Sequence, residues 1–290
     1  MDNNLYIILD CHFLCYRALF TTGDLSYKDI KTGVVYGFLR DLVSLQEHFR
    51  TNNFLFCFDY GVSKRKKIYP EYKANRKKPD ITEEEKKVLF AFRQQIAKLR
   101  EEYLPAIGFN NIFYQKGYEA DDIIAVLCKD VLSYKKNVIV SADGDLFQLV
   151  TANTIMWNPI TKKETTLQTL TTKYDFTGPK WWQVKALAGC PSDNIKGVKG
   201  VGEKTAIKFL QGRLPTHHKT YRTIMNEGEA VYHSNKKLTR LPFSKCNTPT
   251  ISPNKFSNKG WQDVLEVLGM ESMKGRNPFL SVRGTHGKDT

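Results

Sequence analysis

Short apolar runs alternate with longer amphipathic stretches along the first 160 residues. The runs Tyr6–Asp10, Phe54–Asp59 and Val138–Asp143 are almost continuously apolar, and each ends in an aspartate. Continuous apolar runs of this length are typical of strands that are covered on both faces. A shorter run at Ile112–Tyr114 predicts a further strand.

The stretches between these runs predict helices. Residues 34–49 carry apolar side chains at the spacing of one helix face, and residues 83–104 follow Thr82 with three glutamates in the first turn. A further apolar run ends at Leu132. Strands that alternate with helices predict an α/β fold, with a mostly parallel sheet and helices on both faces.

The pattern changes in the second half of the chain. An apolar segment begins at Trp181, a glycine-rich turn follows, and a helix is predicted from about Glu203. Residues 211–260 show little periodicity, so we expect loops and short helices there, and residues 261–273 predict a last packed helix. We therefore expect two domains, at residues 1–175 and 176–290.

Composition predicts a soluble protein of the cytoplasm. No apolar run approaches the roughly 20 residues of a membrane span, and we interpret the N-terminus as a strand rather than a signal peptide. The six cysteines include no CxxC pair, which favours free thiols in a reducing compartment. Cys11, His12 and Cys15 lack a second ligand pair at useful spacing, so we expect them to pack in the core.

The net charge is +14, and such an excess points to an anionic partner, most often a nucleic acid. The charge is clustered, because residues 64–78 contain eight basic residues and one acid. We expect this stretch to be mobile without DNA, since like charges repel and Pro70 and Pro79 interrupt regular structure.

Acidic residues stand where ligands bind in α/β proteins. Asp10, Asp59 and Asp143 each end a predicted strand, and the carboxyl ends of parallel strands share one edge of a sheet. The motif GYEADDII contributes three more acids, and Asp145 follows Asp143 in a tight turn. Taken alone, each acid could be ordinary surface charge. Together, seven acids are predicted to converge: Asp10, Asp59, Glu119, Asp121, Asp122, Asp143 and Asp145.

Such a cluster predicts metal binding. Carboxylates without histidine or cysteine select Mg²⁺ or Mn²⁺ over zinc, and seven acids suggest two or more ions. Two ions can activate a water and stabilise the leaving oxygen of a phosphodiester. The glycine-rich turn offers N–H groups and a helix N-terminus to phosphate, although such a turn can also merely connect two helices.

The ordered motifs resemble the metal-dependent 5′-nucleases, which include the nuclease domain of bacterial DNA polymerase I, bacteriophage 5′-exonucleases and flap endonucleases. The resemblance covers about Tyr6–Leu210. It is carried by LDCHFLCYRALF, FCFDYG, YPEYKANRKKP, GYEADDIIA, SADGDLFQL and PSDNIKGVKGVGEKTA.

The resemblance implies a PIN-like nuclease domain with a basic helical arch near residues 61–88, followed by a helix–three-turn–helix. It implies that metal ligands are Asp10, Asp59, Glu119, Asp121, Asp122, Asp143, Asp145 and Asp193, and that Lys73, Arg76 and Arg17 act in catalysis. DNA contacts are expected at Arg65, Lys66, Lys67, Tyr72, Lys196, Gly197, Lys199, Gly200, Gly202 and Lys204. In relatives the glycine-rich turn can also hold a monovalent cation, which would be K⁺.

The implied activity is that of a structure-specific 5′-3′ exonuclease and flap endonuclease, a monomer that leaves 5′-phosphate products from DNA with a 5′ end, flap or junction. A stand-alone enzyme fits phage replication or bacterial repair. Two alternatives stay open, namely a ribonuclease of the related fold and a DNA-binding protein with a weakened metal site.

One position departs from the family. Cys190 stands where relatives often carry an aspartate, in a pattern like GDxSDN. A thiol is a poor ligand for Mg²⁺, so we expect the second ion to bind more weakly and Mn²⁺ to substitute well. The alternative is that water fills the coordination position and Cys190 only packs.

Overall fold

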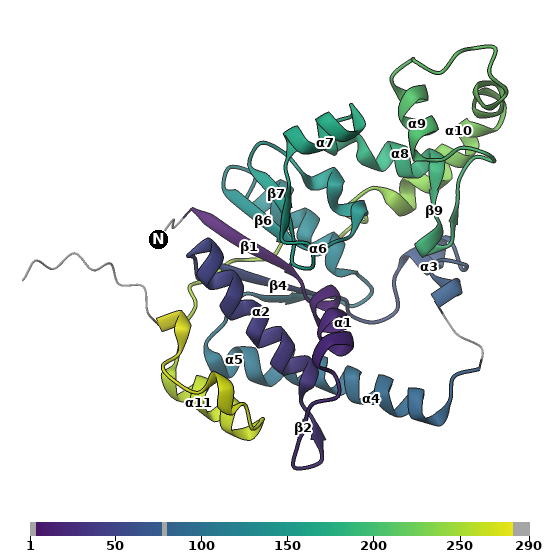
Figure 1. The fold of residues 1–290 in the computed structure, drawn as a ribbon. Helices are drawn as coiled ribbons and strands as arrows, with labels where there is room; N and C mark the ends of the chain where they lie inside the picture. Colours follow the sequence, from purple (N-terminus) through teal and green to yellow (C-terminus); the bar gives the residue numbers. More distant parts are fainter. Residues whose placement is uncertain (1–3, 77–79, 281–290) are drawn as a thin grey trace, which may run out of the picture. The chain divides into compact units, whose positions relative to one another are not determined.

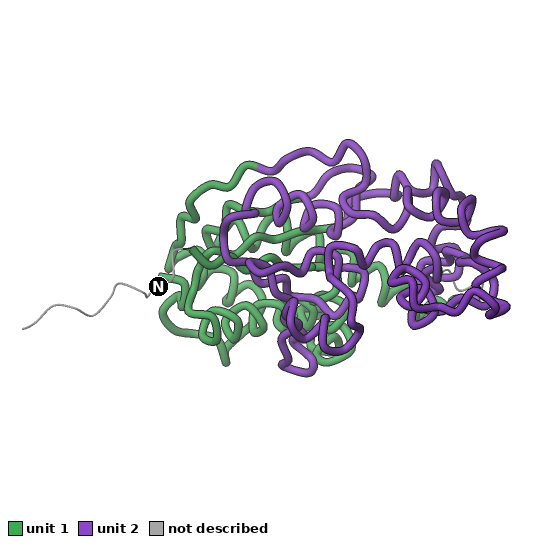
Figure 2. Tube along the Cα trace, turned by 90° about the horizontal axis from the view of Figure 1, so that it is seen from above, with its two compact units in different colours: residues 1–58, 81–113, 250–290 green, residues 59–80, 114–249 purple. Residues whose placement is uncertain are grey.

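The computed structural model describes residues 4–76 and 80–280 of the chain. The chain forms two units, and each is assembled from segments far apart in the sequence (Figure 2). Unit 1 contains residues 1–58, 81–113 and 250–290, and unit 2 contains residues 59–80 and 114–249. These packing units do not follow the expected division into residues 1–175 and 176–290.

Unit 1 is built on parallel strands. β1 (Leu5–Asp10) pairs in parallel with β4 (Phe54–Phe58), and the register sets Asp10 opposite Cys57. β5 (Ile112–Tyr114) lies on the other side of β4. All five side chains of β4 are buried, as expected for a strand covered on both faces. The predicted strands are confirmed.

The helices of unit 1 follow the predicted pattern. α1 (Cys11–Thr22) starts directly after β1, and α2 (Gly33–Phe49) packs against it (Figure 1). A small hairpin of β2 (Ser26–Tyr27) and β3 (Ile30–Lys31) joins the two helices. α4 (Glu83–Lys98) begins at a capping box formed by Thr82 and Glu85. A π-helical turn at Leu99–Tyr103 then leads into α5 (Leu104–Ile107).

The C-terminal segment packs on the early strands of the same unit. α11 (Asn258–Val267) lies beside α5 (Figure 1), and the Lys255 N–H donates to the Gly108 carbonyl at 2.8 Å. The ring of Phe279 contacts the rings of Phe54 and Phe109. Residues 250–280 therefore complete the core of unit 1.

Unit 2 begins with three further strands and short helices. β6 (Lys136–Val140) pairs in parallel with β7 (Thr154–Asn158), and β8 (Lys163–Thr165) pairs antiparallel with β7. α3 (Arg65–Ile68) and α6 (Ala120–Val126) precede these strands in the chain, and α6 continues into a π-helical turn at Leu127–Val131. The sequence did not predict β7 and β8, because their mixed and polar residues lack the apolar signal of β6.

The rest of unit 2 is helical. Its elements are α7 (Leu167–Tyr174), α8 (Trp181–Ala188), β9 (Gly189–Cys190), β10 (Ile195–Lys196), α9 (Glu203–Leu210) and α10 (Lys219–Thr239). A core of apolar side chains from α8, α9 and α10 includes Trp181, Ile207 and Ile224. No helix within the described residues has the length and apolar character that a membrane span requires.

The 21-residue helix α10 corrects the expectation of loops and short helices in residues 211–260. Its buried face includes Gly228 and Asn235, so the apolar period is interrupted. Gly228 allows close packing, since an added Cβ would lie 2.9 Å from the Ile224 side chain. Asn235 is satisfied by bonds to the carbonyls of Ala186 and Lys196 at 2.9 and 2.8 Å. The buried face of α10 therefore contains a polar side chain that pairs with backbone carbonyls, and for this reason the sequence shows no continuous apolar period there.

Candidate metal centre

Three acids of unit 2 meet at the amino end of α6. Glu119 shares a capping box with Asp122, whose Oδ2 accepts the Glu119 N–H at 3.2 Å. Asp59 Oδ1 accepts the N–H of Ala120 at 2.7 Å. A helix N-terminus has unpaired N–H groups and partial positive charge, so carboxylates are favoured there. The local reason for the crowded acids is therefore helix capping.

Asp122 and Arg65 form a buried ion pair, which bears on two predictions. Arg65 Nη1 and Nη2 each lie 2.7 Å from an Asp122 oxygen, and the Phe243 N–H donates to Asp122 Oδ1 at 2.8 Å. Asp122 is 0% exposed and Arg65 2%. With its oxygens already bonded, Asp122 does not fit the role of a metal ligand, and buried Arg65 does not fit that of a DNA contact. The pair instead joins α3 to α6, and Arg65 Nε extends it to the Leu238 carbonyl at 3.0 Å.

Tyr72 connects two acids that are distant in sequence. Its hydroxyl lies 2.8 Å from Glu119 Oε2 and 3.0 Å from Asp193 Oδ2. Burial, followed by the charge of Glu119, raises the pKa of Tyr72 far above its usual range, so the ring stays neutral and donates. Tyr72 is 2% exposed, which does not favour the predicted DNA contact. It holds Glu119 and Asp193 at one place.

Lys73 and Arg76 reach the same acids. Lys73 Nζ donates to Glu119 Oε1 at 2.7 Å, and Arg76 Nη2 donates to Asp193 Oδ1 at 2.6 Å. Burial alone would lower the pKa of Lys73, but Glu119 and Asp193 outweigh it and raise the pKa. The same balance raises the pKa of Arg76 through Asp193. Both side chains are therefore cations beside the acids.

The described part of the basic stretch, residues 64–76, has a defined fold. Asn75 Nδ2 donates to the Pro191 carbonyl at 2.8 Å, and the Lys73 N–H donates to the Asp193 carbonyl at 2.9 Å. In the other direction, Asn194 Nδ2 donates to the Glu71 carbonyl at 2.8 Å. These bonds join residues 71–76 to the turn at residues 191–194. The expected mobility does not fit residues 65–76, because carboxylates and carbonyls compensate the like charges. Lys77, Lys78 and Pro79 lie outside the described residues.

Asp143 and Asp145 follow β6 and repel each other. Asp143 begins a 3-10 helix (Gly144–Leu149), and its Oδ1 accepts the Asp145 N–H at 2.8 Å. Burial, then the charge of Asp145, raises the pKa of Asp143. Lys185 Nζ lies 3.2 Å from Asp145 Oδ1, an oxygen that accepts no hydrogen bond, and 2.9 Å from Glu203 Oε1.

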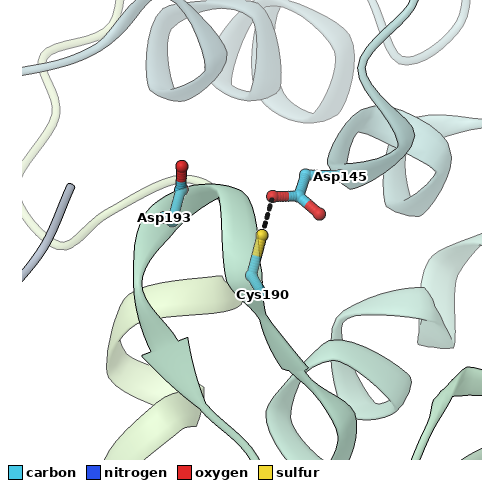
Figure 3. Close-up of side chains that lie close together, drawn as sticks. All are labelled: Asp145, Cys190 and Asp193. Atoms are coloured by element: carbon cyan, nitrogen blue, oxygen red, sulfur yellow. Dashed lines mark hydrogen bonds between the residues drawn. The ribbon is translucent and has the colours of Figure 1, made fainter. Parts of the chain in front are cut away.

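Cys190 lies beside Asp145 and Asp193 (Figure 3). Its Sγ is 3.5 Å from Asp145 Oδ2 and 3.1 Å from Ser192 Oγ. One ligand atom each from Asp145, Cys190 and Asp193 lie within 4.8 Å of one another. Burial, then Asp145, raises the pKa of the Cys190 thiol to about 11. We call Glu119, Asp121, Asp143, Asp145 and Asp193, together with Cys190, the acidic cluster.

Two predicted site residues belong to unit 1. Asp10 ends β1, and its Oδ1 caps α1 by accepting the Phe13 N–H at 3.1 Å. Arg17 on α1 forms an ion pair with Asp41 on α2. Asp10 is buried at the carboxyl end of its strand, where the sequence predicted it.

The glycine-rich turn (residues 196–204) has a different character. Gly200 has a φ of +77°, which favours glycine, and added Cβ atoms at Gly200 and Gly202 would meet nothing within 4 Å. Gly202 precedes α9 without a side-chain cap. Three exposed lysines surround this open backbone, and the described residues offer them no ion pair: Lys196, Lys199 and Lys204.

The donor set of the acidic cluster fits divalent ions. Its oxygens come from carboxylates, no histidine takes part in the close group of Asp145, Cys190 and Asp193, and Asp145 Oδ1 accepts no hydrogen bond. Hard oxygen donors of this kind suit Mg²⁺ and Mn²⁺, while one sulfur donor is added by Cys190.

A family model described as 5′-3′ exonuclease, N-terminal resolvase-like domain, matches residues 5–175. The chain belongs to this 5′-3′ exonuclease family. The resemblance found in the motifs is thereby confirmed.

Relatives of known name agree with this membership. A 5′-3′ exonuclease of Aquifex aeolicus is 37% identical over 209 residues, which cover 70% of this chain and 68% of the relative. One of Bacillus subtilis is 33% identical over 223 residues, covering 73% and 71%. The DNA polymerase I of Caldicellulosiruptor bescii is 34% identical over 219 residues, and the match spans 24% of its length.

Solved structures share the fold. The T5 5′-exonuclease with bound divalent metal ions (zinc) matches with a TM-score of 0.71 and 25% identity, over 82% of this chain and 90% of that one. The T5 D15 flap endonuclease in complex with DNA and metal ions matches with a TM-score of 0.71. It is 23% identical over 91% of this chain and 99% of the other, so this likeness concerns the fold alone.

Sequence reasoning missed one charged residue of this exonuclease-family centre. Lys185 sits on α8 between Asp145 and Glu203, and burial alone would lower its pKa, but these two acids raise it. The signal was present, because a lysine within the otherwise apolar segment WWQVKALAG needs an anion when it is buried.

Proposed function

We propose that this protein is a structure-specific 5′-3′ exonuclease and flap endonuclease that hydrolyses DNA phosphodiester bonds and releases 5′-phosphorylated products. The observation that supports this proposal most is that acidic and basic side chains lie side by side in unit 2. Carboxylates suited to divalent ions lie beside Lys73 and Arg76, which suit phosphate. A catalytic centre for a polyanion needs both sets at one place.

The acidic cluster would hold the ions, which supply an activated water and stabilise the leaving oxygen. Mg²⁺ is the proposed ion, with Mn²⁺ as a substitute. Glu119, Asp121 and Asp143 offer oxygen ligands, as do Asp145 and Asp193. Asp59, which follows β4, is proposed to complete the set. Asp10, at the end of β1, stays a proposed metal ligand. Asp122 pairs with Arg65 and holds Glu119 through the helix cap.

Lys73 and Arg76 are proposed to bind the scissile phosphate. In this structure they donate to Glu119 and Asp193, so each would exchange a carboxylate for a phosphate oxygen when DNA arrives. Tyr72 keeps the two carboxylates in place during that exchange. Arg17 is proposed as an additional basic residue near the reacting phosphate. Lys66 and Lys67 on α3 are proposed to contact the 5′ strand.

The glycine-rich turn is proposed to bind the backbone of duplex DNA as part of a helix–three-turn–helix formed by α8 and α9. Open backbone at Gly200 and Gly202 permits close approach of a phosphate, Gly197 is proposed as a further DNA contact of the same turn, and a K⁺ ion is proposed there. Lys196, Lys199 and Lys204 would supply the charge. The nuclease part is proposed at residues 1–175 and the DNA-binding part at residues 176–290, in a monomer working in the cytoplasm.

A cleavage assay tests this proposal. A duplex with a 5′-labelled single-stranded flap and a matched blunt duplex are incubated with the protein in Mg²⁺ and, separately, in EDTA. We expect Mg²⁺-dependent cleavage near the flap junction, with slower release of nucleotides from the blunt 5′ end. Binding of the flap without cleavage in either Mg²⁺ or Mn²⁺ would instead identify a DNA-binding protein. Preferential cleavage of the same flap made of RNA would identify a ribonuclease.

A further inference from the structure

The thiol of Cys190 is built into the acidic cluster rather than placed near it by chance. Cys190 is 3% exposed, and its sulfur points toward Asp145 in Figure 3. The Sγ to Oδ2 distance is 3.5 Å, and one oxygen of Asp193 lies within 4.8 Å of both atoms. The rest of the Cys190 side chain packs with Tyr72, Ile195 and Leu238, and its sulfur faces the carboxylates.

The backbone fixes this arrangement. Cys190 in β9 pairs with Ile195 in β10, and the intervening residues form a 3-10 turn, Pro191–Asp193. Asn194 closes the turn with a left-handed φ of 57°, and its N–H donates to the Pro191 carbonyl at 3.1 Å. Gly189 has a φ of +78°, and an added Cβ there would lie 2.4 Å from the Gly197 nitrogen. The direction of the Cys190 side chain is therefore set by the pairing of β9 with β10 and by the turn that joins these two strands.

The distances suit one ion shared by sulfur and oxygen. Metal–thiolate and metal–carboxylate bonds are about 2.3 and 2.1 Å, so a common ion can contact two donors that are up to roughly 4.4 Å apart. The observed 3.5 Å between Cys190 Sγ and Asp145 Oδ2 is within that limit. Thiolate ligands favour borderline and soft ions, whereas Mg²⁺ favours oxygen.

We propose that Asp145, Cys190 and Asp193 form a mixed sulfur–oxygen metal position, in which the Cys190 sulfur is a direct ligand and which selects Mn²⁺, Zn²⁺ or Cd²⁺ over Mg²⁺. The inference rests on the proposed two-metal nuclease function, and it names the ion class of one of the two positions. On binding, the sulfur–metal bond forms and the thiol proton passes to solvent. The position nearer Glu119 and Asp121 has oxygen donors and keeps the preference for Mg²⁺.

Optical titration with Cd²⁺ tests the ligand directly and needs no DNA. A thiolate bound to Cd²⁺ produces a charge-transfer absorption in the near ultraviolet. The purified, reduced full-length protein is titrated as wild type, as Cys190→Ser and as Cys246→Ser. Cys246 is the matched control, because it is a partly exposed thiol bonded to Gln115 and has no place in the acidic cluster. Any absorption from the four other cysteines is common to all three proteins and cancels in the difference.

We expect the wild type and Cys246→Ser to show the same band, and Cys190→Ser to lose the intensity of one thiolate together with at least about tenfold in Cd²⁺ affinity. Cys190→Asp should lose the band and gain Mg²⁺ affinity, measured by how much Mg²⁺ displaces bound Mn²⁺. Equal bands in wild type and Cys190→Ser would overturn the inference. So would Mg²⁺ displacing Mn²⁺ equally well from wild type and Cys190→Asp.

The outcome is separable from that of the proposed function. A Cys190-dependent band in a protein that cleaves no DNA would uphold the metal position and contradict the nuclease proposal. Mg²⁺-dependent cleavage without such a band would uphold the nuclease and contradict sulfur ligation.

Discussion

The acidic cluster and the glycine-rich turn lie in the same unit but handle charge in opposite ways. In the cluster, the carboxylates of Glu119 and Asp193 are partly or fully buried and meet partners within the protein, as Glu119 meets Lys73 and Tyr72. In the turn, Lys196, Lys199 and Lys204 are exposed, and the backbone at Gly200 and Gly202 is open. Side chains of the acidic cluster are held by contacts within the protein, whereas the turn is open to an external partner.

This difference assigns catalysis to the acidic cluster and DNA binding to the glycine-rich turn. Buried charges interact strongly and are little screened by salt, so they suit stabilisation of a transition state. Exposed lysines interact weakly and are screened within about 10 Å at 0.1 M salt, so they suit reversible binding of a polyanion. Changes in the acidic cluster should therefore alter rate or stability, and changes in the turn should alter affinity.

The largest effect is expected from Asp143→Asn. Loss of this carboxylate should lower the cleavage rate by about 10²–10³-fold or more, because electrostatic stabilisation is usually the largest catalytic contribution. DNA binding should be unchanged or tighter, because one negative charge is removed near the phosphate. Single-turnover cleavage and filter binding measure the two quantities. Wild-type turnover in saturating Mg²⁺ would remove Asp143 from the centre.

The same variant has a pH signature in metal-free protein. The folded pKa of Asp143 is raised, so its ionised form opposes folding. That penalty is absent below the ordinary aspartate pKa of about 3.9 and develops as the pH rises through the folded pKa. Asp143→Asn should therefore unfold at a higher temperature than wild type at neutral pH in EDTA, and the gap should close toward acid pH. A constant gap across that range would contradict the raised pKa.

The next largest effect is on stability. Arg65→Met leaves the buried carboxylate of Asp122 unpaired, which should cost about 3–5 kcal/mol in the free energy of unfolding. Urea denaturation measures it. The matched control is Lys67→Met, an exposed lysine on the same short helix, which should change stability by no more than about 0.5 kcal/mol. Recovery of most of the loss in the double variant Arg65→Met, Asp122→Leu would confirm that the unpaired charge is the cause.

Lys73 and Lys66 separate catalysis from binding within the basic stretch. Lys73→Ala should lower the single-turnover rate by about 10²-fold with little loss of affinity, because its charge acts at the developing transition state. Lys66→Ala should lower affinity and leave the rate at saturating enzyme unchanged. If both variants lost only affinity, the catalytic role of Lys73 would be wrong.

The smallest effect concerns single lysines of the turn. Lys196→Ala should leave stability within about 0.5 kcal/mol of wild type. It should reduce the slope of log affinity against log salt by about 0.9, the value for one lost duplex phosphate contact. Binding to a labelled duplex at four or more salt concentrations gives the slope. An unchanged slope would place Lys196 away from the DNA.

The sequence predicted the strands that end in Asp10, Asp59 and Asp143 because continuous apolar runs have few alternative structures. It also found the acidic residues, since their types and spacing carry the chemistry. It could not separate the role of Asp122 from that of Asp121, because the partner that occupies Asp122, Arg65, lies 57 residues away. The same limit applies to Tyr72, which the resemblance implied to be a DNA contact and which lies within hydrogen-bond distance of Glu119 and Asp193.

The remaining misses have a common physical origin. α10 was hidden because Asn235 and Gly228 replace apolar residues on its buried face. Mobility was expected for the basic stretch because a count of charges does not reveal which carboxylates and carbonyls receive them. Pairings that depend on tertiary structure leave little trace in local periodicity.

The most direct test of the division of labour is the single-turnover cleavage rate at saturating enzyme for the triple variant Lys196→Ala, Lys199→Ala, Lys204→Ala. A 5′-labelled flap in Mg²⁺ is the substrate, and Asp143→Asn is measured beside it. If the acidic cluster performs the chemistry and the turn only binds, the triple variant should reach the wild-type rate within about twofold once enough enzyme is added, since uniform binding changes affinity and not the chemical step. A rate that stays about 10²-fold lower at saturation would contradict the account.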